Sequence, residues 1–132
     1  MKSDLRPTRR ACAAVAIAAW AACTLTPAAQ AQTYPTKPVQ LVVPFPPGGA
    51  VDIVARLISK KLGDQLGQPI VIENKGGAGT IVGASFVANA PADGYTLLIS
   101  SGSTFTVNPA LNPKLPYDPV KSYEPIGMVA RV

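Results

Sequence analysis

The chain has 132 residues and carries 12 Lys and Arg against 7 Asp and Glu, a formal net charge of +5. This length suits one domain. Because the sequence has no histidine and only two cysteines, both near the N-terminus, Ser-His-Asp catalysis, Cys-His catalysis and ordinary zinc sites are excluded.

The first 31 residues have the pattern of an export signal. Basic residues at positions 2, 6, 9 and 10 precede an alanine-rich apolar run from Ala11 to Leu25, and Ala29-Gln30-Ala31 supplies the small residues that a signal peptidase reads. The run of 15 residues is shorter than the roughly 20 that a membrane-spanning helix needs. We therefore predict cleavage before Gln32 and a periplasmic protein.

Two other export signals stay open beside this one. Arg9-Arg10 resembles a twin-arginine signal, although apolar residues do not follow the arginines directly. Ala21-Ala22-Cys23 resembles a lipoprotein site, although Trp20 stands where a branched aliphatic residue is usual.

The predicted mature chain, residues 32 to 132, is nearly neutral and free of cysteine. It keeps eight basic and six acidic residues, a net charge of +2. Nucleic-acid binding needs a clustered basic face, so we expect no nucleic-acid partner. An exported domain without disulfides must be held by its core, which favours a compact fold.

A strand, a glycine loop and a helix follow one another from residue 39. Val39 to Val43 is β-branched and nearly all apolar, which is typical of a strand buried on both faces of a parallel sheet. Prolines between residues 44 and 47 exclude further pairing, and Gly48 and Gly49 permit positive φ. From Val51 apolar residues recur every four positions, which predicts an amphipathic helix that ends at Gly67.

The same unit is then repeated. Ile70 to Glu73 is a second β-branched run, residues 74 to 79 form a second glycine loop, and Thr80 to Asn89 has the apolar positions of a helix. Two such units in series predict right-handed crossovers and a parallel sheet, that is, an α/β fold.

A third strand and an irregular segment complete the chain. Tyr95 to Ile99 predicts a strand that ends in the polar, flexible loop Ser100 to Thr104, and Phe105 to Leu111 predicts a short helix. Residues 112 to 125 carry four prolines and read as a covering segment anchored by Leu115, Tyr117 and Tyr123. Ile126 to Val132 predicts a fourth strand, inside which the chain stops.

Three loops therefore follow three parallel strands, and ligands bind at that edge of open α/β sheets. For the first loop two interpretations stay open: a tight turn with Asp52 as a helix cap, or an anion site at the helix N-terminus. We interpret Asp52 itself as a cap more than as a ligand contact. The second loop lacks the acidic residue of a ribose site and the Gly-Lys-Ser/Thr of a phosphate loop.

Several consecutive motifs carry a family resemblance that covers the mature chain. They are Tyr34-Pro35-Thr36-Lys37-Pro38, Val42-Val43-Pro44-Phe45-Pro46-Pro47-Gly48-Gly49, Asp52-Ile53-Val54-Ala55-Arg56, Glu73-Asn74-Lys75, Gly77-Ala78-Gly79, Asp93-Gly94-Tyr95-Thr96-Leu97-Leu98 and Leu115-Pro116-Tyr117-Asp118-Pro119. The chain resembles the N-terminal lobe of the tripartite tricarboxylate transporter substrate-binding proteins, the Bug receptor family.

The resemblance implies a type II-like, two-lobed periplasmic receptor, of which residues 32 to 132 are the first lobe and the second is missing. It implies a small carboxylate as ligand (a di- or tricarboxylate, an acidic amino acid or an aromatic acid), a two-component inner-membrane transporter as partner, and neither cofactor nor catalysis. The implied ligand-binding residues are Pro46, Pro47, Gly48, Gly49, Ala50, Val51, Asp52, Gly77, Ala78, Gly79, Thr80, Ser101, Ser103 and Thr104.

Two positions depart from the family pattern. Val51 stands where threonine is frequent, and Thr80-Ile81 where glycine-asparagine is frequent. Both changes favour a less polar ligand or one held by backbone groups. A secreted serine or lysine enzyme and a nucleotide-binding module are the alternatives; Ser59-Lys60 lies within a predicted helix, which argues against the enzyme.

Overall fold

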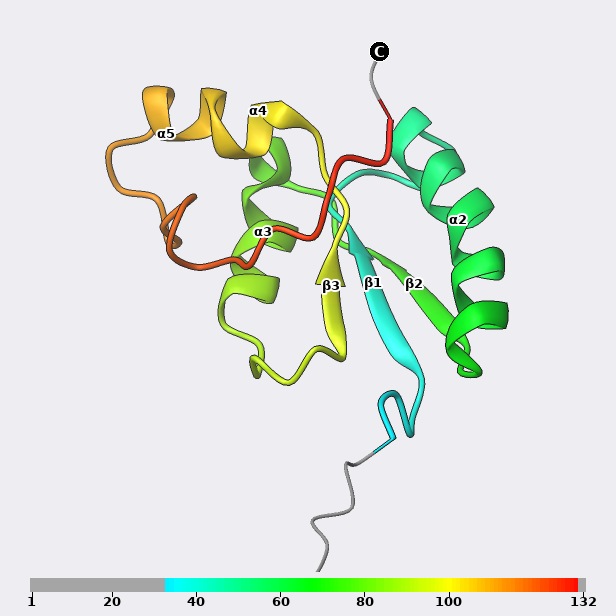
Figure 1. The fold of residues 1–132 in the computed structure, drawn as a ribbon. Helices are drawn as coiled ribbons and strands as arrows, with labels where there is room; N and C mark the ends of the chain where they lie inside the picture. Colours follow the sequence, from blue (N-terminus) through cyan, green and yellow to red (C-terminus); the bar gives the residue numbers. More distant parts are fainter. Residues whose placement is uncertain (1–32, 131–132) are drawn as a thin grey trace, which may run out of the picture. The chain divides into compact units, whose positions relative to one another are not determined.

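A computed structural model describes residues 33–130 of the chain (Figure 1). The predicted export signal lies outside the described residues. The strands are β1 (Val39–Val43), β2 (Ile70–Asn74) and β3 (Thr96–Leu98). The helices are α2 (Ala50–Leu66), the 3-10 turn η1 (Ala78–Thr80), α3 (Ile81–Ala88), α4 (Gly102–Phe105) and α5 (Val107–Leu111).

The three strands form one parallel sheet with β1 at its centre. The order is β2-β1-β3, with Val39 opposite Ile70 and Gln40 opposite Thr96. This confirms the predicted α/β fold with a parallel sheet. Backbone pairing also extends beyond β3, because the N–H of Ile99 donates to the carbonyl of Val42 at 3.0 Å.

Helices cover both faces of the sheet (Figure 1). Leu41 and Val43 of β1 pack against Ala55 of α2, and this cluster is the core of one face. Side chains alternate along a strand, so Gln40 and Val42 point to the other face, which α3 covers. Val42 and Val43 have no exposed surface, as expected for a strand buried on both sides.

Helix α2 ends at Gly67 as predicted, and the structure explains the glycine inside it, Gly63. Gly67 has φ +70° and donates its N–H to the carbonyl of Gly63 at 2.9 Å, which is a left-handed helix end. A Cβ on Gly63 would lie 3.2 Å from the carbonyl oxygen of Gln68. Glycine at this position therefore lets the chain turn closely from α2 into β2.

The covering segment is anchored by tyrosines, as predicted. The Tyr117 side chain is buried, and the Tyr123 ring packs edge-on against Tyr117 and Phe105, with centroids 5.8 and 5.4 Å apart. The Tyr123 hydroxyl also donates to the carbonyl of Ala84 at 2.8 Å. These contacts fix the irregular segment to α3 and α4.

Two sequence-based predictions are wrong. The described part of the predicted fourth strand, Ile126 to Ala130, has no strand geometry, and Ile126 is 84% exposed. A strand needs a neighbour to pair with, and the sheet in residues 33–130 offers it none. The loop predicted from Ser100 to Thr104 becomes helical at Gly102, because Thr104 and Thr106 donate their N–H groups to Ser101 and Gly102.

Within residues 33–130, none of the helices is long and apolar enough to cross a lipid bilayer.

Candidate functional site

The loops that follow the three strands lie at one edge of the sheet and touch one another. Parallel strands end at the same edge, so the loops after Val43, Asn74 and Leu98 emerge together (Figure 1). A Cβ on Gly76 would lie 3.6 Å from the backbone of Phe45 and of Pro46, so the first and second loops are in direct contact.

The first loop presents free backbone donors. Gly48 has φ +82° with open space where a side chain would lie, and Gly49 has extended geometry at the start of the 17-residue helix α2. Within the described part of the chain, the N–H groups of Ala50, Val51 and Asp52 have no hydrogen-bond acceptor. Such donors, together with the positive end of the helix dipole, attract an anion.

The buried side chain of Asp52 fixes the first loop by hydrogen bonds. Its side chain is only 2% exposed and accepts a hydrogen bond from the Gly48 N–H at 2.9 Å. Arg56 donates to it from Nε at 2.9 Å and from Nη2 at 3.1 Å, and Asn74 Nδ2 donates at 2.9 Å. Hydrogen bonds from Arg56, Gly48 and Asn74 hold the pKa of this carboxyl far below its usual range. Asp52 lies in the first turn and fixes the loop through Gly48, but the N-cap residue is Gly49 and it has no side-chain cap hydrogen bond, so Asp52 is not the N-cap.

Asn74 joins the first two loops. It ends β2, and its Nδ2 group donates both to Asp52 and, at 3.1 Å, to the carbonyl of Phe45. The sequence analysis did not select Asn74 or Arg56 as site residues. The signal was available, because a polar residue at the end of a parallel strand faces the edge where the loops meet.

The second loop has an unusual backbone. Gly77, Ala78, Gly79 and Thr80 have φ values of +135°, +46°, +63° and +81° in succession. Left-handed geometry is free of penalty for glycine, but it costs on the order of 1–3 kcal/mol at Ala78 and at the β-branched Thr80. Surrounding contacts must therefore impose this shape.

A buried hydroxyl pair links the second loop to the third. Thr80 Oγ1 and Thr104 Oγ1 are 2.8 Å apart, and Thr104 Oγ1 lies 2.5 Å from Ser100 Oγ. Thr104 has no exposed surface and Thr80 is 6% exposed. These two predicted site residues thus face each other and not the solvent, whereas Ser103 is exposed with its hydroxyl 2.6 Å from that of Ser101.

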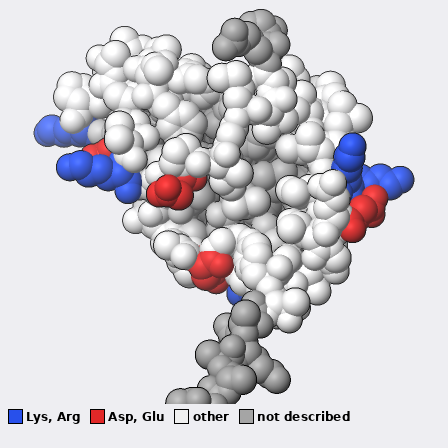
Figure 2. Space-filling view, viewed as in Figure 1, with Lys and Arg blue, Asp and Glu red and all other residues white. Residues whose placement is uncertain are grey.

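The parts of the three loops that hold the predicted ligand-binding residues carry no charged side chain except Asp52, and Lys75 at the start of the second loop is paired with Glu73. Residues 46–51, 77–80 and 101–104 contain only Pro, Gly, Ala, Val, Ser and Thr. On the face shown in Figure 2, Lys and Arg gather mainly at the left and right margins, and two acidic groups lie closer to the middle. An anion at this edge would be held by backbone N–H groups and hydroxyls. Within residues 33–130, no group of His, Cys, Asp and Glu could hold a metal ion.

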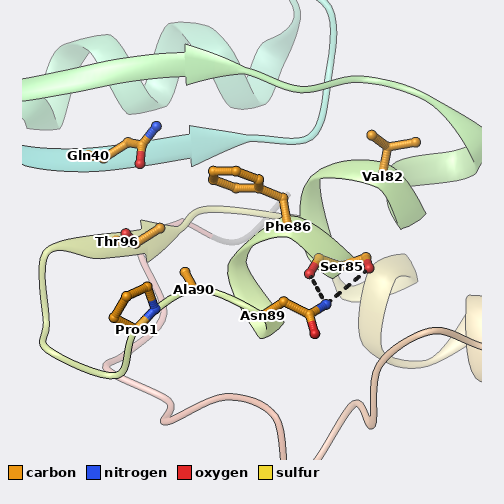
Figure 3. A pocket seen from close by; sticks show the side chains of 8 residues that line it. All are labelled: Gln40, Val82, Ser85, Phe86, Asn89, Ala90, Pro91 and Thr96. Atoms are coloured by element: carbon orange, nitrogen blue, oxygen red, sulfur yellow. Dashed lines mark hydrogen bonds between the residues drawn. The ribbon is translucent and has the colours of Figure 1, made fainter.

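A separate hollow of about 630 Å³ lies between α3 and the sheet (Figure 3). Gln40 and Thr96, at the starts of β1 and β3, line it, so it is toward the opposite end of the strands. Phe86 extends from α3 toward Gln40, and the Asn89 side chain is bonded to the Ser85 carbonyl at 2.7 Å. The hollow offers few free polar groups, and we do not assign the site to it.

A parallel α/β lobe with ligand-type loops at the carboxyl edge of its strands is the architecture of a periplasmic binding protein. The chain belongs to the tripartite tricarboxylate transporter family receptors, whose family model matches residues 54–132. BugT of Bordetella pertussis is 47% identical over 103 residues, which are 77% of this chain and 32% of that protein.

Solved structures agree with this assignment. The periplasmic binding protein BugD is 45% identical with a TM-score of 0.68, over 71% of this chain and 31% of that one. MatC from Rhodopseudomonas palustris, solved with bound malate, is 47% identical with a TM-score of 0.65, over 67% and 30%. An R. palustris protein solved with adipate is 43% identical with a TM-score of 0.62, over 65% and 29%.

These findings confirm the family resemblance and decide between the alternatives. The family and its structural neighbours are receptors that bind solutes, which excludes the reading as a secreted enzyme. The chain spans about a third of the length of the curated relatives that it matches.

Proposed function

We propose that this chain supplies one wall of the carboxylate site in an extracytoplasmic receptor, which passes a small carboxylate to a two-component membrane transporter. The observation that carries the proposal is the group of free N–H donors at Ala50 and Val51, in a loop that Asp52 holds rigid. Family membership and the malate and adipate of two related structures support the same ligand class.

The ligand carboxylate would lie against the first loop, with the second and third loops beside it. Residues 46–51, 77–80 and 101–104 carry no Lys or Arg, so recognition would rest on backbone dipoles that are already oriented and need little reorganisation. Val51 offers no hydroxyl, and the Thr80 hydroxyl is already bonded inside the protein. Both features favour an apolar dicarboxylate such as adipate over the hydroxylated malate.

Export is part of the proposal and has its own test. The full chain, expressed in a Gram-negative host, should be recovered from the periplasm with Gln32 at its N-terminus. A lipid-modified Cys23, or a protein retained in the cytoplasm with residues 1–31 intact, would contradict it.

Binding is tested by NMR on the ¹⁵N-labelled periplasmic protein, titrated with adipate, malate and uncharged dimethyl malate. NMR registers millimolar affinity, which suits an open wall where the carboxylate stays partly hydrated. We expect the amides of residues 48–51 to move with both acids and not with the ester. Shifts confined to other regions, or equal shifts with the ester, would count against the site.

The variant Gly49→Val sharpens the test. Gly49 has φ −72° and ψ 163°, which valine adopts readily, so the fold should survive, but the new side chain crowds the donors. Gly127→Val is the matched control, because a Cβ on Gly127 meets no atom within 4 Å and lies outside the three loops. The first variant should lose the response to adipate and the second should keep it.

A further inference from the structure

Asn108 is a buried polar residue that reaches from α5 to a loop far away in the sequence. It is 8% exposed, and its Nδ2 group donates to the carbonyl of Gly79 at 2.8 Å and to the Thr80 hydroxyl at 3.1 Å. Both acceptors belong to the left-handed second loop. The buried amide therefore contacts the loop in which Ala78 and Thr80 have unfavourable positive φ angles.

Besides Asn108, the second loop is held by the Thr80–Thr104 hydroxyl pair and by two backbone hydrogen bonds from the start of α3, one of which runs from the Ile81 N–H to the Ala78 carbonyl. The other, from the Val82 N–H to the Gly77 carbonyl, is long, at 3.5 Å. Thr80 has a β-branched side chain and a backbone in the left-handed region, a combination that is unfavourable in an isolated peptide. Asn108 supplies two donors at the two residues where the left-handed run ends.

The same contact reaches the third loop. The hydroxyl of Thr80 that accepts from Asn108 is also bonded to Thr104, in the first turn of α4. Tyr117 closes the cluster from outside by donating its hydroxyl to the Thr104 carbonyl at 2.9 Å. One buried amide thus touches the second loop directly and the third through a single hydroxyl.

We propose that Asn108 is a positioning residue of the ligand site: it holds Gly77–Thr80 in the left-handed conformation and sets the spacing of the second and third loops. The site that it would position rests on the function proposed above. Asn108 itself points into the protein and does not touch the ligand, and Thr80 and Thr104 act with it instead of binding ligand.

The test compares Asn108→Asp with wild type, first without ligand. Aspartate has nearly the same shape but lacks the NH₂ donors, so an acceptor would face the Gly79 carbonyl. We expect the amide resonances of residues 77–80 to shift or broaden and the backbone couplings that report φ to change at Ala78 and Thr80. Resonances of residues 48–51 should stay in place.

Two controls separate positioning from general stability. Asn112→Asp makes the same change on an exposed residue four positions further on, and it should leave the loop unaltered. Tyr117→Phe removes the bond to the Thr104 carbonyl and a long contact of 3.5 Å from Asn108 Nδ2, but it leaves both Asn108 bonds to the second loop intact. It should therefore lower Tm and leave the φ-sensitive couplings in place. The proposal is overturned if Asn108→Asp does not alter the loop, or if Tyr117→Phe alters it as much.

A second variant keeps the proposal testable if Asn108→Asp folds poorly. Glycine accepts left-handed geometry, so Thr80→Gly should remove much of the need for Asn108. In that background Asn108→Asp should lower Tm by less than half as much as in wild type. Equal losses in both backgrounds would contradict the proposal.

Titration with adipate then separates this proposal from the proposed function. If the site and the positioning role are both correct, Asn108→Asp should reduce adipate-induced shifts at residues 77–80 several-fold and those at 48–51 less. If wild type ignores adipate while the unliganded loop still responds to Asn108→Asp, the proposed function fails and the positioning role stands.

Discussion

Gly83 sets the distance between α3 and the first two loops, and Gly83→Ala should therefore be strongly destabilising. A Cβ built on Gly83 would lie 2.7 Å from the Lys75 carbonyl oxygen and 2.8 Å from Pro44 Cβ. Ordinary contacts begin at about 3.4 Å, so the shortfall is about 0.6 to 0.7 Å against two groups at once. Lys75 begins the second loop and Pro44 begins the first.

The magnitude follows from two opposed terms. Overpacking of this kind costs typically about 1–3 kcal/mol, since neither a backbone carbonyl nor a proline ring can swing away. Alanine is favoured over glycine in a helix by up to about 1 kcal/mol. The steric term wins, and we expect a net loss of about 1–2 kcal/mol, or roughly 4–16 °C in Tm for a unit of this size.

Thermal unfolding followed by far-UV circular dichroism measures the loss, with Gly63→Ala as the control. Its Cβ would meet a single oxygen at 3.2 Å, a small overlap that the gain in helix propensity largely offsets. Gly83→Ala should therefore be less stable than Gly63→Ala by at least about 1 kcal/mol. A Gly83→Ala protein as stable as wild type would refute the close packing at Pro44 and Lys75.

Three further variants test individual contacts. Because the pKa of Asp52 is lower in the folded state, its contribution to stability is complete above its unfolded pKa and is lost as the pH falls through the folded value. In urea titrations, the stability gap between wild type and Asp52→Asn should therefore close progressively below about pH 4. A gap that widens there would be contrary to the hydrogen bonds described. Tyr117→Phe leaves the Thr104 carbonyl without its buried donor and should cost roughly 1–2 kcal/mol by urea unfolding, and an unchanged midpoint would mean that water replaces the hydroxyl. Gly94→Ala places a side chain at φ +80°, 3.1 Å from the Tyr34 hydroxyl, and should lower Tm, whereas a gain in Tm would show that the turn relaxes freely.

Much of the fold could be predicted because its signals are local. The apolar run Val39 to Val43 and the four-residue periodicity after Val51 each specify their element with no knowledge of the rest of the chain. Gly67 marks the helix end for the same reason. Right-handed connection of two strand-loop-helix units then leaves little choice of topology, so the meeting of the three loops at one edge followed from sequence.

The interior of the site could not be predicted because it depends on contacts between distant residues. Thr80 and Thr104 looked like polar loop residues open to a ligand, and only the folded chain turns them toward each other. Asn108 reaches back 28 residues to Thr80, and local sequence contains no trace of that contact. The predicted fourth strand at Ile126 failed for a related reason, since a β-branched or apolar run indicates a strand only where a partner strand exists.

The central place of β1 has a consequence for the order in which the protein folds. β1 is the first strand made, but its register partners on one side begin 31 residues later, at Ile70, and on the other side 56 residues later, at Thr96. Until both have been synthesised, the most apolar strand of the sheet has unpaired backbone along at least one side. Chain closure of this range makes folding slow compared with that of helical proteins. Among the three strands, residues 39–43 therefore wait longest for their pairing partners, and an apolar strand with unpaired backbone is open to association with other chains.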